Sequence, residues 1–145
     1  MTILDANVLL YGYNSDSPHH EAAAGWLAEL LASDETVALP WITIWAFIRI
    51  STNSRLTPRP LSSKQAFGFV EQWLDEPEVV VLEPGPRHAE ILKRLMIEYG
   101  APGPLVTDAV LAALALENGA ALASTDQDFR RFPELRWINP LSLAR

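Results

Sequence analysis

Short apolar runs alternate with longer segments of helical periodicity along the chain of 145 residues. This alternation limits the possible folds more than any other feature of the sequence. The runs comprise residues 2–4, 36–39, 79–82, 120–124 and 136–138. Apolar runs of this length, bounded by turn residues, predict buried strands, and the run at 79–82 is a strong signal for one. Because strands that alternate with helices form parallel sheets, we expect an α/β fold. Its form would be a three-layer α/β/α sandwich with a central, mostly parallel sheet of four to five short strands.

Helices are predicted between these strands. The expected segments are residues 6–13, 20–32, 42–52, 62–74, 87–99 and 104–118, with one helical turn at 129–132. The β-branched content of 42–52 leaves a strand possible there. Gly100 and Gly119 are expected to end the helices that precede them. No repeat or linker divides the chain, so we expect one domain over residues 1–145.

Three aspartates lie where these elements begin or end. Asp5 follows the first strand, Asp126 follows the strand at 120–124, and Asp108 lies near the start of an alanine-rich, apolar helix. In α/β sheets, ligands bind in the crevice outside the carboxyl ends of the strands. Buried carboxylates are costly unless they are neutralised, and a hard divalent cation commonly neutralises them. We therefore expect the three aspartates to meet at a metal site.

Structural explanations compete with this interpretation. Asp126 could cap the helical turn that follows it, and Asp128 could act as a cap or as a support for the site. Asp108 could be a favourable acid in the first turn of a helix. For Asp5 we identify no local structural requirement for an acid.

Charge is distributed unevenly. With 18 acidic and 11 basic residues the chain carries −7, which argues against passive nucleic-acid binding over the whole surface. Residues 36–70, however, contain no acid and include Arg49, Arg55, Arg59 and Lys64. Either this segment forms a basic face that contacts RNA phosphates, through Arg49, Arg55 and Arg59, or it reflects composition alone. Arg49 could equally lie on a solvated helix face.

Three aromatic residues, Trp41, Trp45 and Phe47, lie in the same segment. They could stack on bases, or they could serve the core or a dimer contact. The chain has no cysteine, which fits a reducing compartment, and the cytoplasm is the expected location. No apolar run approaches the ~20 residues that a membrane span needs, so we expect no membrane association.

Four sequence blocks carry a family resemblance: ILDAN at 3–7, VTDA at 106–109, STDQDF at 124–129 and WINP at 137–140. In this order they resemble a PIN domain, specifically that of the VapC toxins. The resemblance implies a PIN-like fold and an endoribonuclease that depends on Mg²⁺ or Mn²⁺ and acts as the toxin of a type II toxin–antitoxin pair. The implied partners are an RNA substrate, a small antitoxin and a second copy of the toxin.

By position, the resemblance makes Asp5, Asp108 and Asp126 the catalytic and metal-binding residues. Asn7, Thr125 and Asp128 would support the site. A hydroxyl such as that of Thr125 could instead serve only the local turn.

The chain departs from the PIN pattern at one position. That pattern usually includes a glutamate early in the third helix, and Ala46 occupies the matching position here. We expect one tightly held ion, with any second ion recruited by the RNA phosphate. The alternative is a PIN-like RNA- or protein-binding module with weak or no nuclease activity. A phosphatase or receiver domain fits less well, because Asn7 replaces the second acid of the former and no lysine follows Lys93.

Overall fold

The computed structural model describes residues 1–142. Its strands are β1 (Thr2–Leu4), β2 (Val37–Pro40), β3 (Val79–Leu82), β4 (Ala121–Ala123) and β5 (Trp137–Ile138). All neighbouring pairs are parallel, and the order across the sheet is β3-β2-β1-β4-β5. The expected parallel sheet is thereby confirmed. The chain winds from β1 outward in one direction and then returns to place β4 on the other side of β1, so the switch point of the sheet lies between β1 and β4.

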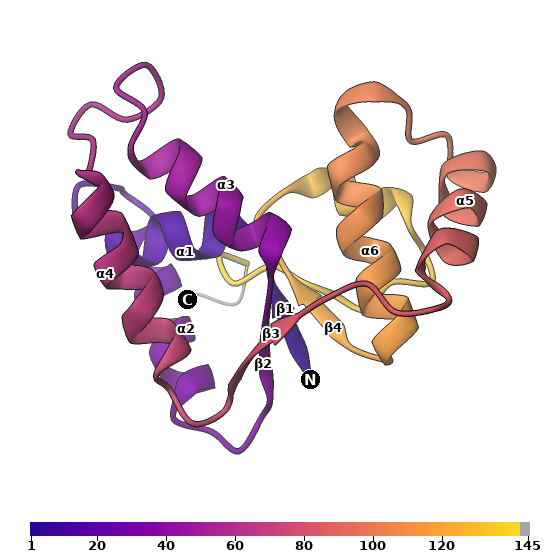
Figure 1. Cartoon of the computed structure of the whole chain (residues 1–145), viewed down its shortest axis with the longest axis horizontal. Coiled ribbons are helices and arrows are strands. Elements are labelled where there is room, and N and C mark those ends of the chain that lie inside the picture. The colour runs from indigo at the N-terminus through magenta and orange to yellow at the C-terminus, as the bar shows by residue number, and fades with distance from the viewer. Residues whose placement is uncertain (143–145) are drawn as a thin grey trace.

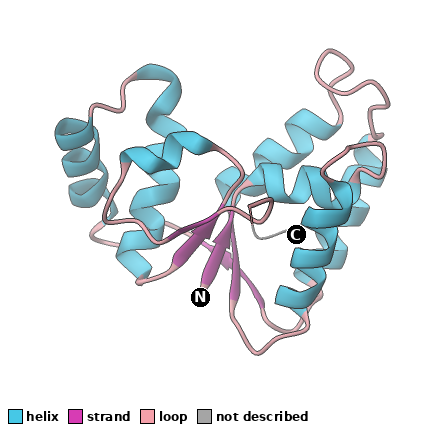
Figure 2. Ribbon diagram, turned by 180° about the vertical axis from the view of Figure 1, so that it is seen from behind, coloured by secondary structure: helices cyan, strands magenta, loops and turns pink. Residues whose placement is uncertain are grey.

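Helices cover both faces of this sheet. They are α1 (Ala6–Tyr13), α2 (His20–Leu31), α3 (Trp41–Ser51), α4 (Ser63–Leu74), α5 (His88–Tyr99) and α6 (Val106–Asn118), with the 3₁₀ turns η1 (Gly103–Leu105) and η2 (Gln127–Arg131). Helices α1 to α4 lie on one face, and α5 and α6 lie on the other (Figures 1 and 2). This arrangement confirms the three-layer sandwich. Within residues 1–142, no helix combines the length and the apolar character needed to cross a bilayer.

The alternation of side chains along β1 explains why both faces are filled. Ile3 packs into the apolar cluster under α5 and α6, whereas the next residue, Leu4, packs into the cluster under α1 to α4. Both side chains are almost fully buried. A strand with apolar residues in both directions therefore becomes the centre of the sandwich.

Segment 41–51 is a helix, which resolves the ambiguity of its β-branched residues. Its buried positions are Thr43, Ile44, Phe47 and Ser51, and they follow the spacing of one helix face. The α-helix α6 starts at Val106, two residues later than expected, because a 3₁₀ turn precedes it. Gly100 and Gly119 end their helices with φ of 61° and 60°, as expected.

The strand expected at 79–82 is present, but the expectation that it is buried was wrong. β3 lies at the edge of the sheet and pairs only with β2 among the described strands. Val80 and Val81 are each 39% exposed, and only Val79 and Leu82 pack against the two cores. An edge strand leaves one side without a neighbour, so β-branched residues predict the strand but not its depth.

Candidate metal and active site

Asp5 is held at the point where β1 passes into α1. Its backbone N–H donates to the carbonyl of Ala123 on β4 at 2.9 Å, which continues the pairing of the two strands by one residue. Its Oδ1 accepts the N–H of Ala6 at 2.7 Å and caps α1. This local role of Asp5 was not predicted from the sequence, although an aspartate before a helical segment is a common capping signal.

Ser124 connects the ends of β1 and β4. Its Oγ donates to Oδ2 of Asp5 at 2.7 Å, and it accepts from Nδ2 of Asn7 at 3.0 Å and from the backbone N–H of Asp126 at 3.1 Å. Asn7 also donates to Oδ2 of Asp5 at 3.2 Å and accepts from the N–H of Thr125 at 3.1 Å. Asn7 is thus hydrogen bonded to Asp5, Ser124 and Thr125, and Thr125 takes part through its backbone. No role was predicted for Ser124 from the sequence. The one sequence signal for such a role is a hydroxyl side chain at the end of an otherwise apolar strand.

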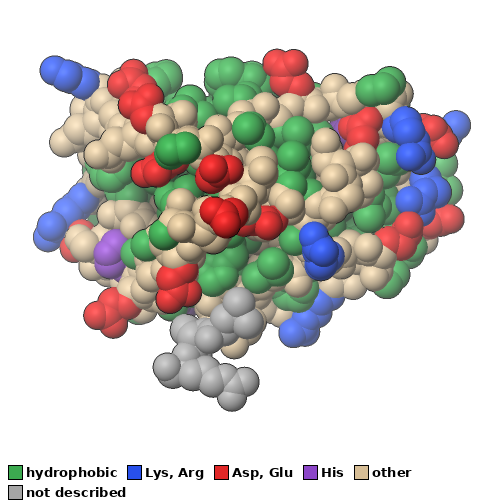
Figure 3. All heavy atoms as spheres, turned by 90° about the horizontal axis from the view of Figure 1, so that it is seen from below, with side chains coloured by type: hydrophobic (Ala, Val, Ile, Leu, Met, Phe, Trp, Pro, Cys, Tyr) green, Lys and Arg blue, Asp and Glu red, His purple; other side chains and the backbone are tan. Residues whose placement is uncertain are grey.

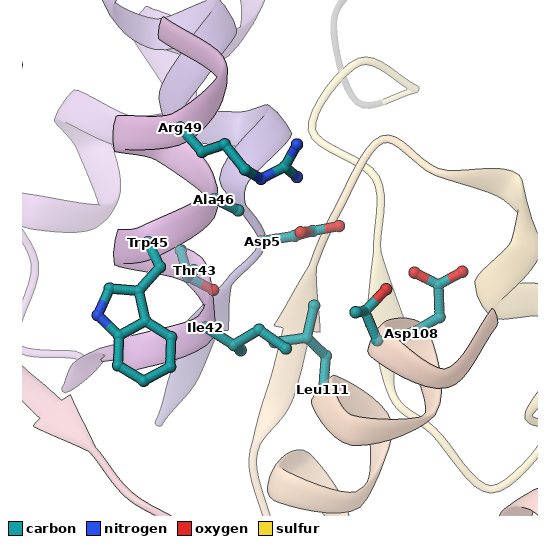
Figure 4. A pocket seen from close by; sticks show the side chains of 9 residues that line it. Asp5, Ile42, Thr43, Trp45, Ala46, Arg49, Asp108 and Leu111 are labelled. Atoms are coloured by element: carbon teal, nitrogen blue, oxygen red, sulfur yellow. The ribbon is translucent and has the colours of Figure 1, made fainter. Parts of the chain in front are cut away.

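Three carboxylates converge beside this network. Asp108, Asp126 and Asp128 each offer one oxygen, and these three atoms all lie within 4.8 Å of one another. Oδ1 of Asp126 also accepts the N–H of Asp128 at 2.9 Å, so Asp126 caps η2 as the structural alternative expected. Asp128 does not cap that turn, and its carboxylate joins the cluster. Asp5 lies next to this group and shares a cavity with Asp108 (Figure 4).

Electrostatic repulsion accompanies the convergence. The pKa of Asp108 is raised to about 6, mainly by burial and then by the charges of Asp126, Asp5 and Asp128, whereas Arg131 lowers it. Burial also raises the pKa of Asp5; the hydrogen bonds that Asp5 accepts oppose this change, and repulsion from Asp126 adds to it. These four carboxylates therefore offer oxygen ligands whose negative charge is only partly neutralised, which suits Mg²⁺ or Mn²⁺.

A cavity of about 390 Å³ opens beside Asp5 and Asp108. Besides Asp5 and Asp108 it is lined by Ile42, Thr43, Trp45, Ala46, Arg49, Thr107 and Leu111 (Figure 4). Thr43 fixes α3 at this wall, because its Oγ1 donates to the carbonyl of Leu4 at 2.7 Å. Among the described lining residues, α3 contributes no acid, since Ala46 lies where the resemblance expects a glutamate.

The three candidate arginines are separated. Arg49 lines the cavity, whereas Arg55 and Arg59 lie in the loop between α3 and α4. Nε of Arg59 lies 3.6 Å from Oδ2 of Asp16, and both side chains are exposed, so this ion pair contributes little. On the face seen in Figure 3, Lys and Arg side chains are scattered and acidic ones lie near the centre, so that face offers no continuous basic path.

The aromatic residues of α3 divide between core and surface. Phe47 is fully buried, which confirms a core role for it. Trp41 and Trp45 are 40% and 63% exposed and stack with ring centroids 6.1 Å apart. They line a second, apolar cavity of about 490 Å³ together with Leu82 and Val110. These two tryptophans therefore remain available for a partner.

The chain is similar in sequence to known proteins over most of its length. A family model described as the PIN domain matches residues 2–135. Ribonuclease VapC37 of Mycobacterium tuberculosis is 43% identical over 143 residues, which cover 99% of this chain and 99% of that protein.

Solved structures share the fold at low sequence identity. M. tuberculosis VapC20, described as a sarcin-ricin loop cleaving toxin, has a TM-score of 0.68 at 13% identity, with 94% of this chain and 98% of that chain covered. A toxin–antitoxin complex from Klebsiella pneumoniae has a TM-score of 0.63 at 18% identity, with 97% and 98% covered. The family model and the 43% identity across nearly the whole chain show that this protein belongs to the PIN-domain family and to its VapC branch.

Proposed function

We propose that the chain is an endoribonuclease that depends on Mg²⁺ or Mn²⁺ and acts as the toxin of a toxin–antitoxin pair. The observation that carries the proposal is the convergence of Asp108, Asp126 and Asp128 within 4.8 Å, next to Asp5, at the switch point of the sheet. The relative named Ribonuclease VapC37 supports RNA as the substrate.

In this proposal Asp5, Asp108 and Asp126 hold the ion, and Asp128 assists them. When bound, the ion would lower the pKa of a coordinated water and neutralise phosphoryl oxygens during phosphodiester hydrolysis. Ser124 and Asn7 fix the orientation of Asp5 through hydrogen bonds to its Oδ2. The cavity lined by Asp5 and Asp108 would give an RNA backbone access to the site. Because α3 adds no acid, we propose one tightly held ion.

Cleavage of a structured RNA tests the proposal. The unaltered chain should cut it in Mg²⁺ or Mn²⁺ and not in EDTA. Asp5→Asn keeps an oxygen that can cap α1 but removes the charge, so it should abolish cutting while urea unfolding shows an intact fold. Asp34→Asn, an exposed aspartate in the turn after α2, is the matched control and should cut normally. Cutting that persists in EDTA and in Asp5→Asn would exclude this function.

A second candidate follows from Ala46. If the missing carboxylate is essential, the chain is a PIN-like module that binds RNA or protein with weak or no turnover. This candidate predicts that Ala46→Glu gains cleavage activity over the unaltered chain. Efficient cleavage by the unaltered chain would eliminate it.

We also propose two protein partners. The toxin–antitoxin complex from K. pneumoniae supports a small antitoxin, and the exposed pair Trp41 and Trp45 supports a homodimer contact. Trp45→Glu should then convert a dimer to a monomer in light scattering, whereas Ile97→Glu, on an exposed position of α5, should not. A toxin that cleaves cellular RNA acts in the cytoplasm, so we place the protein there.

A further inference from the structure

Arg49 lies on the one wall of the cavity that carries no acid. It is three residues from Ala46 on α3, so both side chains lie on the same face of the helix. Figure 4 shows the Arg49 side chain extending from α3 toward the space above Asp5, with the short Ala46 side chain next to it. Because Ala46 ends at Cβ, its side chain leaves room in this part of the cavity.

The charge of Arg49 is not used by the fold. Among residues 1–142, its guanidinium takes part in no salt bridge and no hydrogen bond. Arg131 differs, because its Nη1 donates to the carbonyls of Tyr99 and Gly100. A guanidinium carries five N–H donors in a planar fork, and those of Arg49 face a cavity instead of a carboxylate.

The negative charge at the acidic site opposes the approach of an RNA phosphate. Asp5, Asp108, Asp126 and Asp128 together carry up to four negative charges, and one divalent ion offsets only two of them. A phosphodiester adds one more, so its approach is opposed unless another positive group meets it. Arginine binds phosphate oxygens bidentately, which combines charge with a fixed orientation.

We propose that Arg49 binds an RNA phosphate beside the metal site and supplies the positive charge that a second metal ion would otherwise contribute. This role rests on the proposed ribonuclease function and deepens it. Arg49 is then a substrate-binding residue of the toxin, and Ala46 is the residue that keeps its guanidinium available. A glutamate at position 46 would lie within pairing distance of Arg49 and compete with the phosphate.

RNA affinity without turnover tests this role. Fluorescence polarisation of a labelled single-stranded RNA, in Ca²⁺ instead of Mg²⁺, should show that Arg49→Ala binds roughly tenfold or more weakly. Loss of one phosphate contact should also reduce the slope of log affinity against log salt concentration by about 0.7. Arg49→Lys should retain most of the slope but not all of the affinity, because it keeps the charge and loses the fork.

The control is Arg87→Ala, which removes an exposed arginine that precedes α5 and should change neither quantity. Ala46→Glu should weaken RNA binding as Arg49→Ala does. If the unaltered chain cleaves and binds RNA while Arg49→Ala binds with the same affinity and slope, the role of Arg49 is wrong and the ribonuclease function stands. If the unaltered chain neither binds nor cleaves RNA, both are wrong.

Discussion

Replacing Asp108 with asparagine should stabilise the protein in the absence of metal. The pKa of this carboxyl rises from 3.8 to about 6 because of burial and repulsion by its acidic neighbours. A shift of about 2 units corresponds to about 3 kcal/mol at 1.36 kcal/mol per unit. Asp108 is only partly buried, so solvent screening reduces the expected gain to about 1–2 kcal/mol at pH 7.5.

The pH dependence identifies the cause. Between pH 3.8 and about 6 the folded protein binds more protons at this site than the unfolded chain, so this carboxyl lowers stability as the pH rises through that window. Asp108→Asn lacks the carboxyl. It should therefore match the unaltered protein near pH 4 and exceed it at pH 7.5.

Urea unfolding in EDTA at the two pH values measures the difference, with Asp34→Asn as the control that should change little. Adding Mn²⁺ should make the unaltered chain the more stable of the two, because only this chain keeps all the carboxylates proposed to hold the ion. An ion at a free concentration of about 100 times its Kd raises the free energy of unfolding by about 2.7 kcal/mol. If Asp108→Asn is no more stable than the unaltered protein at pH 7.5 in EDTA, or if its gain persists at pH 4, charge repulsion is not the cause.

Three further substitutions test the surroundings of the site. Ser124→Ala should lower the free energy of unfolding, measured with urea, by about 2–3 kcal/mol, and should weaken Mn²⁺ binding, measured by calorimetry, about tenfold or more. An unchanged Mn²⁺ affinity would contradict the role of Ser124 in positioning Asp5. Thr43→Val should cost about 1 kcal/mol in urea unfolding, because the carbonyl of Leu4 loses a buried donor, and no loss would show that water replaces it. Gly100→Ala should cost about 1–2 kcal/mol in the same assay because φ is 61° there; a neutral result would mean that the helix end relaxes.

The sequence predicted the helices and strands better than it predicted how deeply each of them is buried. The alternation of apolar runs and helical segments was sufficient to predict the order of strands and helices along the chain, because the periodicity of each element is a local property. Val80 and Val81 are exposed because β3 is the strand at the edge of the sheet. Which strand takes the edge position depends on pairing between strands that are distant in the sequence. The identity of the third helix was ambiguous for the same reason, since only packing selects which side chains of 41–51 face the core.

The candidate site shows a similar division. Asp5 and Asp126 could be placed at one edge of the sheet, because parallel strands bring their carboxyl ends together. Whether Asp128 caps the turn or joins the acidic cluster could not be decided from the sequence, since this depends on how the turn after β4 directs the side chain. Ser124 was missed because a lone buried serine has no distinctive pattern, and its importance depends on two residues more than a hundred positions away.

The acids of the site differ in how far the fold itself supports them. Asp5 accepts three hydrogen bonds, from Ala6, Asn7 and Ser124, and Asp126 accepts one, from the N–H of Asp128. Asp108 accepts none from the described residues, and burial together with repulsion by its acidic neighbours raises its pKa to about 6. Hydrogen bonds to a carboxylate stabilise its charged form, so the acid that lacks them depends most on an external cation. The fold thus fixes Asp5 in place without a metal ion. If Asp108 binds the proposed ion, that ion neutralises its charge, and Asp108 is then the position at which metal binding and stability should be most tightly coupled.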